Sequence, residues 1–256
     1  MLKLPTVIGV IPSRYASTRL PAKPLVDLLG KPMVQRVYER AQASKMLTRV
    51  IVATDDARIE TAVKHFGGEV VLTSPDIKSG SDRVAAVAAQ VAGDIFVNVQ
   101  GDEPLLAPEM IDQAVQLLID DPDVPVGTLA KKIETVDDLL NPSVVKVACT
   151  RNGEALYFSR AAIPFVRDEA DAANWLLHGT FYKHIGLYVF RKDFLMQYAL
   201  LPFSRLEHAE RLEQLRILEA GYKIKVGITS YDSISVDTPE DAQRVVQILR
   251  AASVRL

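Results

Sequence analysis

The sequence predicts an α/β protein with a doubly wound, mostly parallel central sheet and helices on both of its faces. In the first half, apolar runs alternate with amphipathic segments. The runs at 7–11 and 95–99 lack polar alternation, which is typical of strands buried on both faces of a parallel sheet. Because such sheets bind ligands at the carboxyl ends of their strands, we expect a site where these runs end.

Helix signals separate the strands of the first half. Pro32 can open an amphipathic helix. The strand at 50–53 leads to Asp55 and Asp56, either of which could cap a helix that Gly67 ends. Further elements are expected as a strand at 70–72 and a helix at 81–91.

The second half is less regular. Strand-like segments at 144–150 and 155–159 flank Asn152-Gly153, a strong hairpin signal. Residues 166–179 are the best candidate for a lid. Ser204 and Glu207 have capping-box spacing and predict one helix that continues to Gly221. The other expected elements are helices at 108–119 and from Pro239 onward, and strands at 126–130, 181–190, 223–228 and 234–236.

Composition narrows the class of protein. The 256 residues carry a net charge of −2, so there is no overall basic footprint for nucleic acid. One cysteine, Cys149, excludes an intrachain disulfide and a cysteine-rich zinc site. No apolar run reaches transmembrane length, and the apolar part of the N-terminus is too short for a signal peptide. We therefore expect a cytoplasmic protein without nucleic-acid or membrane partners.

The loop after the first strand is cationic. Arg14, Arg19 and Lys23 follow Pro12 in a stretch rich in hydroxyl side chains, and the first 36 residues contain only one acid, Asp27. This pattern favours a site for a polyanion, most simply a triphosphate. A solvated loop whose charges serve solubility explains the stretch equally well. Glycine-rich dinucleotide and P-loop motifs are missing, so phosphates would be held by side-chain cations and a metal.

Two carboxylates stand where strands are expected to end. Asp102 follows the 95–99 strand, directly after Gly101, and could hold Mg²⁺ against phosphate oxygens. Gly101 would let a nucleotide approach the backbone. Asp237 could complete the metal site. From the residues alone, a turn aspartate at 102 and a helix-start residue at 237 are the simpler interpretations.

Two further clusters carry polar side chains. Small residues and Arg83 at a helix start could read a base or ribose, although a plain helix cap explains them equally well. His184 and Tyr188 point the same way on a strand, and with Arg160 they could bind a carboxylate and hydroxyls of an acidic sugar. A structural role is the default for a single strand histidine, and the helix residues Glu213 and Gln214 could simply be solvated.

Eight segments in order resemble the motifs of the CMP-Kdo synthetases, the 3-deoxy-manno-octulosonate cytidylyltransferases. They are IPSRYASTRLPAKPL, ATDD, SGSDR, VNVQGDEP, LYFSRAAIP, HIGLY, LEQLR and VDTPED, and the resemblance covers about residues 7–245. It implies a Rossmann-like nucleotidyltransferase fold with an inserted hairpin and lid region. It also implies transfer of CMP from CTP to the sugar acid Kdo for lipopolysaccharide synthesis, with Mg²⁺ and a homodimer.

The resemblance also implies roles for individual residues. Arg14, Lys23, Asp102 and Asp237 would carry catalysis, the two aspartates as Mg²⁺ ligands. The nucleotide would be bound by Pro12, Ser13, Arg14, Arg19, Lys23, Ser79, Gly80, Ser81, Arg83, Gln100 and Gly101. Kdo would be bound by Gln100, Arg160, His184, Tyr188, Glu213 and Gln214.

The expected organisation is a single nucleotidyltransferase domain over 1–256. It comprises a nucleotide-binding half at about 1–130, a sugar-binding and dimerisation insertion at about 131–222, and a return to the main sheet at 223–256. The sequence departs from the family pattern at Ala22, where glycine is common. Two alternatives stay open: activation of another sugar acid, such as 8-amino-Kdo or sialate, and a catalytically silent nucleotide-binding relative.

Overall fold

The computed structural model describes residues 4–16, 20–77 and 79–253. The chain divides into two compact units, Met1–Asp112 with Asp232–Leu256, and Gln113–Tyr231. These boundaries lie near residues 113 and 231 rather than near 130 and 222, so strand 126–132 belongs with the second unit. The assignment of the whole chain to one nucleotidyltransferase domain stays a prediction.

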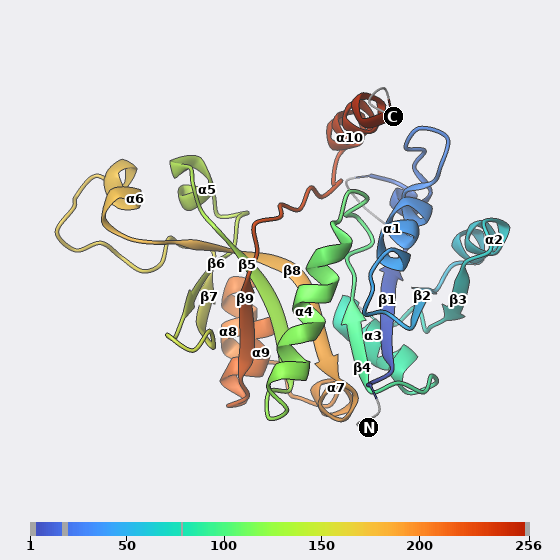
Figure 1. The fold of residues 1–256 in the computed structure, drawn as a ribbon, viewed down its shortest axis with the longest axis horizontal. Helices are drawn as coiled ribbons and strands as arrows, with labels where there is room; N and C mark the ends of the chain where they lie inside the picture. Colours follow the sequence, from blue (N-terminus) through green and yellow to red (C-terminus); the bar gives the residue numbers. More distant parts are fainter. Residues whose placement is uncertain (1–3, 17–19, 78, 254–256) are drawn as a thin grey trace. The chain divides into compact units, whose positions relative to one another are not determined.

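The first unit contains a four-stranded parallel sheet in the order β3-β2-β1-β4 (Figure 1). Its strands are β1 (Val7–Ser13), β2 (Arg49–Thr54), β3 (Glu69–Leu72) and β4 (Ile95–Asn98). β1 and β4 are buried throughout or nearly so, as their continuous apolar character predicts. The chain runs outward from β1 to β3 and then returns to β4 on the other side of β1. The strand order therefore reverses between β1 and β4, which is where doubly wound sheets bind ligands.

Helices connect or follow these strands. They are the 3₁₀ turn η1 (Lys23–Leu25), α1 (Met33–Gln42), α2 (Ala57–His65), α3 (Gly80–Ala88), the start of α4 (Pro108–Asp120) and α10 (Pro239–Ser253). From β1 to β3 the chain moves across the sheet in one direction, and from β3 to β4 it moves back. Because each crossover is right-handed, α3 lies on the opposite face of the sheet from α1 and α2. The prediction of helices on both faces is confirmed.

Local signals explain where these helices start. Asp56, and not Asp55, caps α2 by accepting a hydrogen bond from Arg58 N at 2.9 Å. Ser79 caps α3 by accepting from Asp82 N at 3.0 Å. α10 packs through Ala242 and Val245 on an apolar cluster that also holds Leu20, Leu28, Met33 and Val236. This packing places the segment before α10 beside the first loop.

The second unit holds a mixed arrangement of strands. β5 (Val126–Lys132) pairs antiparallel with β8 (Tyr182–Arg191) and parallel with β9 (Ile224–Ile228). β6 (Lys146–Cys149) and β7 (Ala155–Ser159) form the expected hairpin, with Gly153 at a φ of 75°. The helices are α5 (Val136–Leu140), η2 (Ala172–Asn174), α6 (Trp175–His178), α7 (Lys192–Tyr198), α8 (Arg205–Glu210) and α9 (Gln214–Glu219).

Two predicted elements were wrong. The single helix over 204–221 is two helices, because Arg211 adopts a left-handed conformation with a φ of 55° between α8 and α9. The strand at 234–236 does not form. Instead, Val236 N donates to the carbonyl oxygen of Asp102 at 2.8 Å, so this segment is fastened by a loop contact rather than by a strand ladder.

The predicted lid segment is anchored by its tryptophan. Trp175 is buried among Ile133, Leu139 and Phe181, and its indole Nε1–H donates to the carbonyl oxygen of Glu169 at 3.0 Å. The side chain of Trp175 therefore serves packing. Whether residues 166–179 act as a lid stays a prediction.

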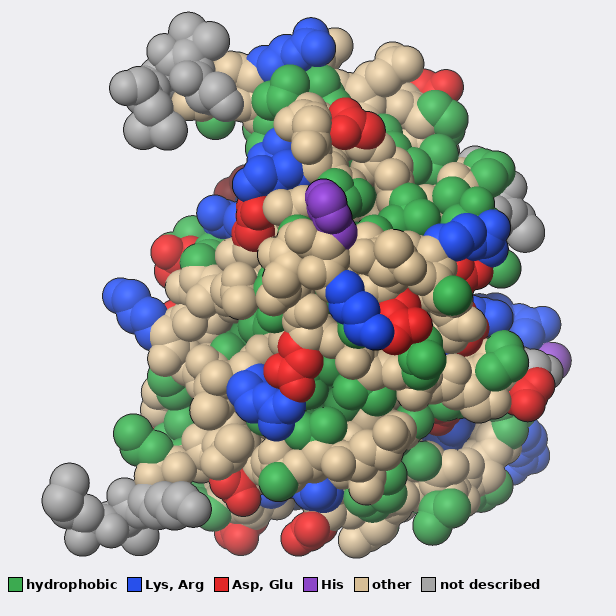
Figure 2. Space-filling model, turned by 90° about the vertical axis from the view of Figure 1, so that its right-hand side faces the viewer, with side chains coloured by type: hydrophobic (Ala, Val, Ile, Leu, Met, Phe, Trp, Pro, Cys, Tyr) green, Lys and Arg blue, Asp and Glu red, His purple; other side chains and the backbone are tan. Residues whose placement is uncertain are grey.

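Charges are mixed on one face of the molecule. On the face drawn in Figure 2, the lysine and arginine side chains of the described residues are interspersed with acidic ones. This agrees with the small net charge of −2. Among the described residues, no helix is both long and apolar enough to cross a bilayer.

Candidate active site

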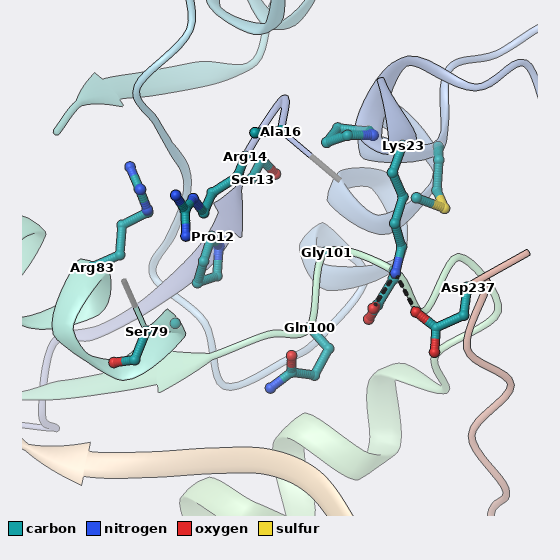
Figure 3. A pocket seen from close by; sticks show the side chains of 14 residues that line it. Pro12, Ser13, Arg14, Ala16, Lys23, Ser79, Arg83, Gln100, Gly101 and Asp237 are labelled. Carbon is teal, nitrogen blue, oxygen red and sulfur yellow. Dashed lines mark hydrogen bonds and ion pairs between the residues drawn. The ribbon is translucent and has the colours of Figure 1, made fainter. Parts of the chain in front are cut away.

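A cavity of about 370 Å³ opens at the carboxyl ends of β1 and β4 (Figure 3). It lies within the first unit, and its position is the one that the strand reversal predicts. Arg83 and Ser79 line one end of it, Lys23 and Asp237 the other, and Gln100 lies between them. The full lining is Pro12, Ser13, Arg14, Ala16, Lys23, Pro24, Met33, Ser79, Gly80, Arg83, Gln100, Gly101, Asp102 and Asp237.

Lys23 joins the two predicted metal ligands. Its ammonium donates to Asp102 Oδ2 at 2.6 Å and to Asp237 Oδ1 at 2.8 Å. Burial opposes the charged form of Lys23, but the two carboxylates outweigh it and raise the pKa of Lys23 above its usual value. Asp102 and Asp237 lie 79 and 214 positions after Lys23 in the chain, and the fold brings all three into one charge cluster.

The segment that carries Asp237 is fastened to the turn that carries Asp102. Val236 N donates to the carbonyl oxygen of Asp102, and the hydroxyl of Ser233 donates to the carboxyl of Glu103. Glu103 is buried, and this burial raises its pKa to about 7. These two contacts hold Asp102 and Asp237 on the same side of Lys23.

The helix-start interpretation of Asp237 does not fit the geometry. Thr238 Oγ1 accepts from Asp241 N at 3.2 Å, and the carboxylate of Asp241 accepts from Thr238 N at 3.0 Å. This reciprocal pair is a capping box, and it supplies the cap of α10. The carboxylate of Asp237 points instead to Lys23 (Figure 3).

The donor set suits Mg²⁺. Asp102 and Asp237 bring carboxylate oxygens to one point on the cavity wall, where they already hold a cation, the Lys23 ammonium. Mg²⁺ prefers one or two carboxylates together with substrate phosphate oxygens. Among the described residues no group of three or more acidic, histidine or cysteine side chains forms a metal cage. The pair fits a cation completed by its substrate.

The arginine end of the cavity is built on a buried ion pair. The fully buried Arg83 donates to Asp55 Oδ2 at 3.0 Å, and the half-exposed Arg14 lies 3.8 Å from the same oxygen through its Nε. Gly80 lies beside Asn98, whose amide Nδ2 donates to Ser81 Oγ at 3.3 Å. The start of α3 is thereby packed against the end of β4.

Three expected nucleotide contacts need comment. Ser81 is buried beneath the cavity, bonded to Asn98, and is not among the lining residues. A Cβ on Gly101 would come within 2.6 Å of the carbonyl oxygen of Pro12, so glycine is required here by the neighbouring strand as well as by any ligand. Arg19 lies outside the described residues.

The second unit brings His184 and Tyr188 together. Their ring centroids are 5.2 Å apart, and Phe158 packs against His184 at 5.0 Å. Burial lowers the pKa of His184 to about 3, so its imidazole is neutral. Because Thr128 Oγ1 can donate its one proton to the carbonyl of Leu187, His184 Nε2 donates to Thr128 at 2.9 Å. His184 Nδ1 is then an acceptor.

Tyr188 and Gln214 are also buried. Burial, with the charge of Glu213 nearby, raises the pKa of Tyr188 well above its usual value. The side-chain Nε2 of Gln214 is buried without a hydrogen-bond partner. A polar group left in this state is an expected place for a bound hydroxyl. The side chains of His184 and Tyr188 therefore form a polar cluster of the kind that the sequence predicts. The charge of Glu213 is near enough to Tyr188 to act on its pKa.

The guanidinium of Arg160 makes structural hydrogen bonds to the backbone. Its Nε donates to the carbonyl oxygen of Glu210 at 2.7 Å and its NH1 to that of Pro142 at 3.0 Å, while its backbone N bonds the carboxylate of Glu210. Ser159 donates to the same carboxylate. Two of the guanidinium nitrogens are thus committed to backbone carbonyls, and its expected role toward Kdo stays a prediction.

Sequence reasoning missed several residues of the site. Ala16, Pro24 and Met33 complete the lining as apolar or small residues, and nothing in their type signals a site. Asp55 and Glu103 lie inside the quoted motifs ATDD and VNVQGDEP, so their position after strand ends was a usable signal. The burial that separates them from ordinary turn acids is visible only in three dimensions.

A parallel α/β sheet with cations and a carboxylate pair at its strand ends defines a nucleotide-binding enzyme of the nucleotidyltransferase class. The sequence profile of the cytidylyltransferases matches residues 8–224. The chain belongs to the cytidylyltransferase family.

Individual relatives match over almost the whole chain. The 3-deoxy-manno-octulosonate cytidylyltransferase of Geobacter sulfurreducens is 51% identical over 95% of this chain and 99% of its own length. The protein of the same name from Geotalea uraniireducens is 52% identical over 95% and 99%. A solved structure, CMP:2-keto-3-deoxy-manno-octonic acid synthetase complexed with CTP, is 42% identical with a TM-score of 0.90, covering 96% of this chain and 99% of that chain.

Proposed function

We propose that this protein transfers CMP from CTP to 3-deoxy-manno-octulosonate (Kdo), releasing pyrophosphate. The observation that carries the proposal is the carboxylate pair held at one cation, at the end of a cavity that also presents Arg14 and Arg83. Relatives that share one name, 3-deoxy-manno-octulosonate cytidylyltransferase, match this chain over nearly their full length, which supports the choice of CTP and Kdo.

The residues of the first unit act on the nucleotide. Arg14 and Lys23 neutralise the triphosphate, which would otherwise repel an anionic sugar acid. Asp102 and Asp237 hold Mg²⁺, which when bound supplies further charge neutralisation at the phosphate oxygens. Arg83 and Ser79 line the end of the cavity for the base and ribose. Their work is positioning and electrostatics, with no covalent nucleophile.

The residues of the second unit act on the sugar acid. His184 offers Nδ1 as an acceptor to a sugar hydroxyl, and Tyr188 and Gln214 offer donors. Because the pKa of Tyr188 is raised, its phenol keeps its proton at neutral pH. The anomeric hydroxyl of Kdo then attacks the α-phosphorus in line, and pyrophosphate leaves.

The direct experiment measures pyrophosphate release with CTP, Mg²⁺ and, in turn, Kdo, 8-amino-Kdo or sialate. We expect release with Kdo. A preference for another acid would replace Kdo in the proposal, and no release with any acid would favour a silent relative. Asp102→Asn should abolish release while the protein stays folded. Glu109→Gln, which changes an exposed acid in the first turn of α4, is the matched control and should keep full activity.

We infer further that the enzyme is a homodimer working in the cytoplasm. The support is the family resemblance, which implies both. Sedimentation at micromolar concentration tests the dimer, and a single species at the monomer mass of 28.2 kDa would contradict it.

A further inference from the structure

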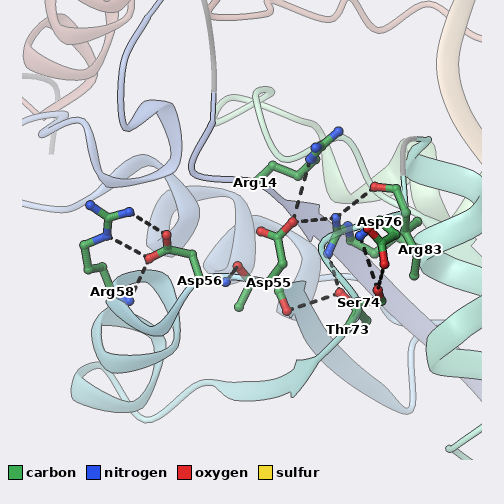
Figure 4. A network of polar contacts seen from close by, with 10 residues as sticks. Arg14, Asp55, Asp56, Arg58, Thr73, Ser74, Asp76 and Arg83 are labelled. Atoms are coloured by element: carbon green, nitrogen blue, oxygen red, sulfur yellow. Dashed lines mark hydrogen bonds and ion pairs between the residues drawn. The ribbon is translucent and has the colours of Figure 1, made fainter.

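Asp55 carries a partly buried carboxylate at the carboxyl end of β2, and it has no role in the reaction as described above. Its neighbour Asp56 takes the helix-capping position on α2 and pairs with the exposed Arg58. The carboxylate of Asp55 points the other way, toward Arg14 and Arg83 (Figure 4). Its side chain is only 12% exposed.

One oxygen of Asp55 is shared between two cavity arginines. Asp55 Oδ2 accepts from Arg83 NH2 at 3.0 Å and lies 3.8 Å from Arg14 Nε. Arg83 is fully buried. Because a buried guanidinium without a counter-charge is costly, Asp55 is the group that allows Arg83 to sit at the cavity wall in its charged form.

The remaining contacts of Arg83 leave its Nε without a partner. Its NH1 donates to Thr73 Oγ1, and its NH2 also reaches the carbonyl oxygen of Ile77 at 3.3 Å. Its Nε is buried and has no hydrogen-bond partner, although the side chain lines the cavity. A buried N–H left unpaired is unfavourable, and a ligand acceptor would satisfy it.

We propose that Asp55 is a positioning residue for the nucleotide. It fixes the guanidinium of Arg83 in one orientation, through the planar fork that Arg83 presents, so that Nε–H is offered to an acceptor of the bound nucleotide. It also ties Arg14 to the same anchor point, which links the two cationic side chains of that end. The proposal rests on the proposed function for the identity of the nucleotide, CTP.

A positioning role predicts an effect on binding rather than on chemistry. The Kd of CTP, measured by calorimetry without sugar acid, should rise at least 10-fold in Asp55→Asn. At saturating CTP, kcat should stay within about 3-fold of the wild type, and KM for Kdo should not change. In an Arg83→Met background, adding Asp55→Asn should weaken CTP binding less than 3-fold, because Asp55 acts mainly through Arg83 and only its longer contact with Arg14, at 3.8 Å, remains.

Asp56→Asn is the matched control. It changes the adjacent carboxylate, which faces Arg58 and the start of α2, and it should lower the melting temperature while leaving the Kd of CTP within 2-fold. Equal weakening of CTP binding in Asp55→Asn and Asp56→Asn would overturn the proposal, since local stability at the start of α2 would then explain both. An unchanged Kd in folded Asp55→Asn would also overturn it.

A second variant covers the case in which Asp55→Asn does not fold. Thr73→Val removes the other side-chain partner of Arg83 without leaving a charge unpaired, and it should weaken CTP binding 3-fold or more; no change would overturn the proposal. The wild type separates the two levels of inference. A wild-type protein that binds no CTP refutes the proposed function, whereas normal wild-type binding with unaffected variants refutes only the role of Asp55.

Discussion

Replacing Lys23 with methionine tests the charge cluster at the carboxylate end of the cavity. The change keeps an unbranched side chain and removes the ammonium that bonds Asp102 at 2.6 Å and Asp237 at 2.8 Å. The side chain of Lys23 is 14% exposed, and those of the two aspartates are 29% and 31% exposed. The bridge is therefore neither a surface ion pair nor a fully desolvated one.

The magnitude follows from that intermediate burial. A hydrogen bond to a charged group contributes about 1.5–3 kcal/mol, and solvent screening at roughly one-third exposure reduces each of the two bonds. Removing Lys23 also leaves two carboxylates facing each other. Against this, the desolvation cost of the ammonium is recovered. We expect a net loss of about 2–3 kcal/mol in the free energy of unfolding, or about 4–12 °C in melting temperature.

The assay is thermal unfolding in EDTA and in Mg²⁺. Because the variant leaves the carboxylates open to a cation, Mg²⁺ should raise its melting temperature more than that of the wild type. Lys31→Met is the matched control. It removes an ammonium 2.7 Å from Glu39, but both side chains are 40% exposed, and the expected loss is below about 1 kcal/mol.

The pH dependence carries a definite sign. The folded-state pKa of Lys23 is raised, so its stabilisation is fully present below its unfolded-state pKa near 10.4 and is lost as the pH rises through the higher folded-state value. The stability difference between wild type and Lys23→Met should therefore be constant from pH 7 to 9 and shrink above about pH 10.5. Equal melting temperatures in EDTA at pH 7 would refute the reasoning.

Three further predictions concern single side chains. Asp237→Asn should abolish pyrophosphate release with little loss of stability, whereas Asp241→Asn should cost about 1 kcal/mol of stability and keep activity; the reverse pattern would return Asp237 to a capping role. The folded-state pKa of His184 is lowered to about 3, so its ring NMR signals should not titrate between pH 5 and 8. Its contribution to stability should fall as the pH drops below about 6.5. A ring signal that titrates between pH 5 and 8 in the wild type and is missing in His184→Gln would contradict the burial of His184. Ala22 has a φ of 55°, so Ala22→Gly should raise the free energy of unfolding by up to about 1 kcal/mol, and a lower melting temperature would speak against this conformation.

Local patterns predicted most of the first unit. β1 and β4 are continuous apolar runs, and the end of each run marks where the cavity opens. The hairpin at Asn152-Gly153 followed from turn chemistry alone, because the φ of 75° at residue 153 suits glycine. Signals of this kind act over a few residues, so they survive without knowledge of the rest of the chain.

Predictions failed where long-range contacts or a single backbone torsion decided the outcome. The stripe of leucines after Ser204 has helical spacing through both α8 and α9, and the pattern does not reveal that Arg211 turns left-handed between them. The apolar residues at 234–236 have the pattern of a strand, but the backbone N–H of Val236 donates to the carbonyl oxygen of Asp102, 134 residues earlier in the chain. The division into two units near residues 113 and 231 depends on contact density, which composition does not reveal, and the single-domain assignment stays a prediction.

By itself, the sequence determined the chemical inventory of this protein. It supplies a cationic loop after β1, Asp102 after β4, and Asp237 before the last helix. Only the tertiary structure decided which charges meet. Lys23 is held between Asp102 and Asp237, and Asp55 rather than Asp56 holds Arg83, because folding brings residues distant in the chain within 3 Å and buries some of them away from water. Burial and pairing are properties of the packed chain, and they separate a site residue from a solvated one of the same type.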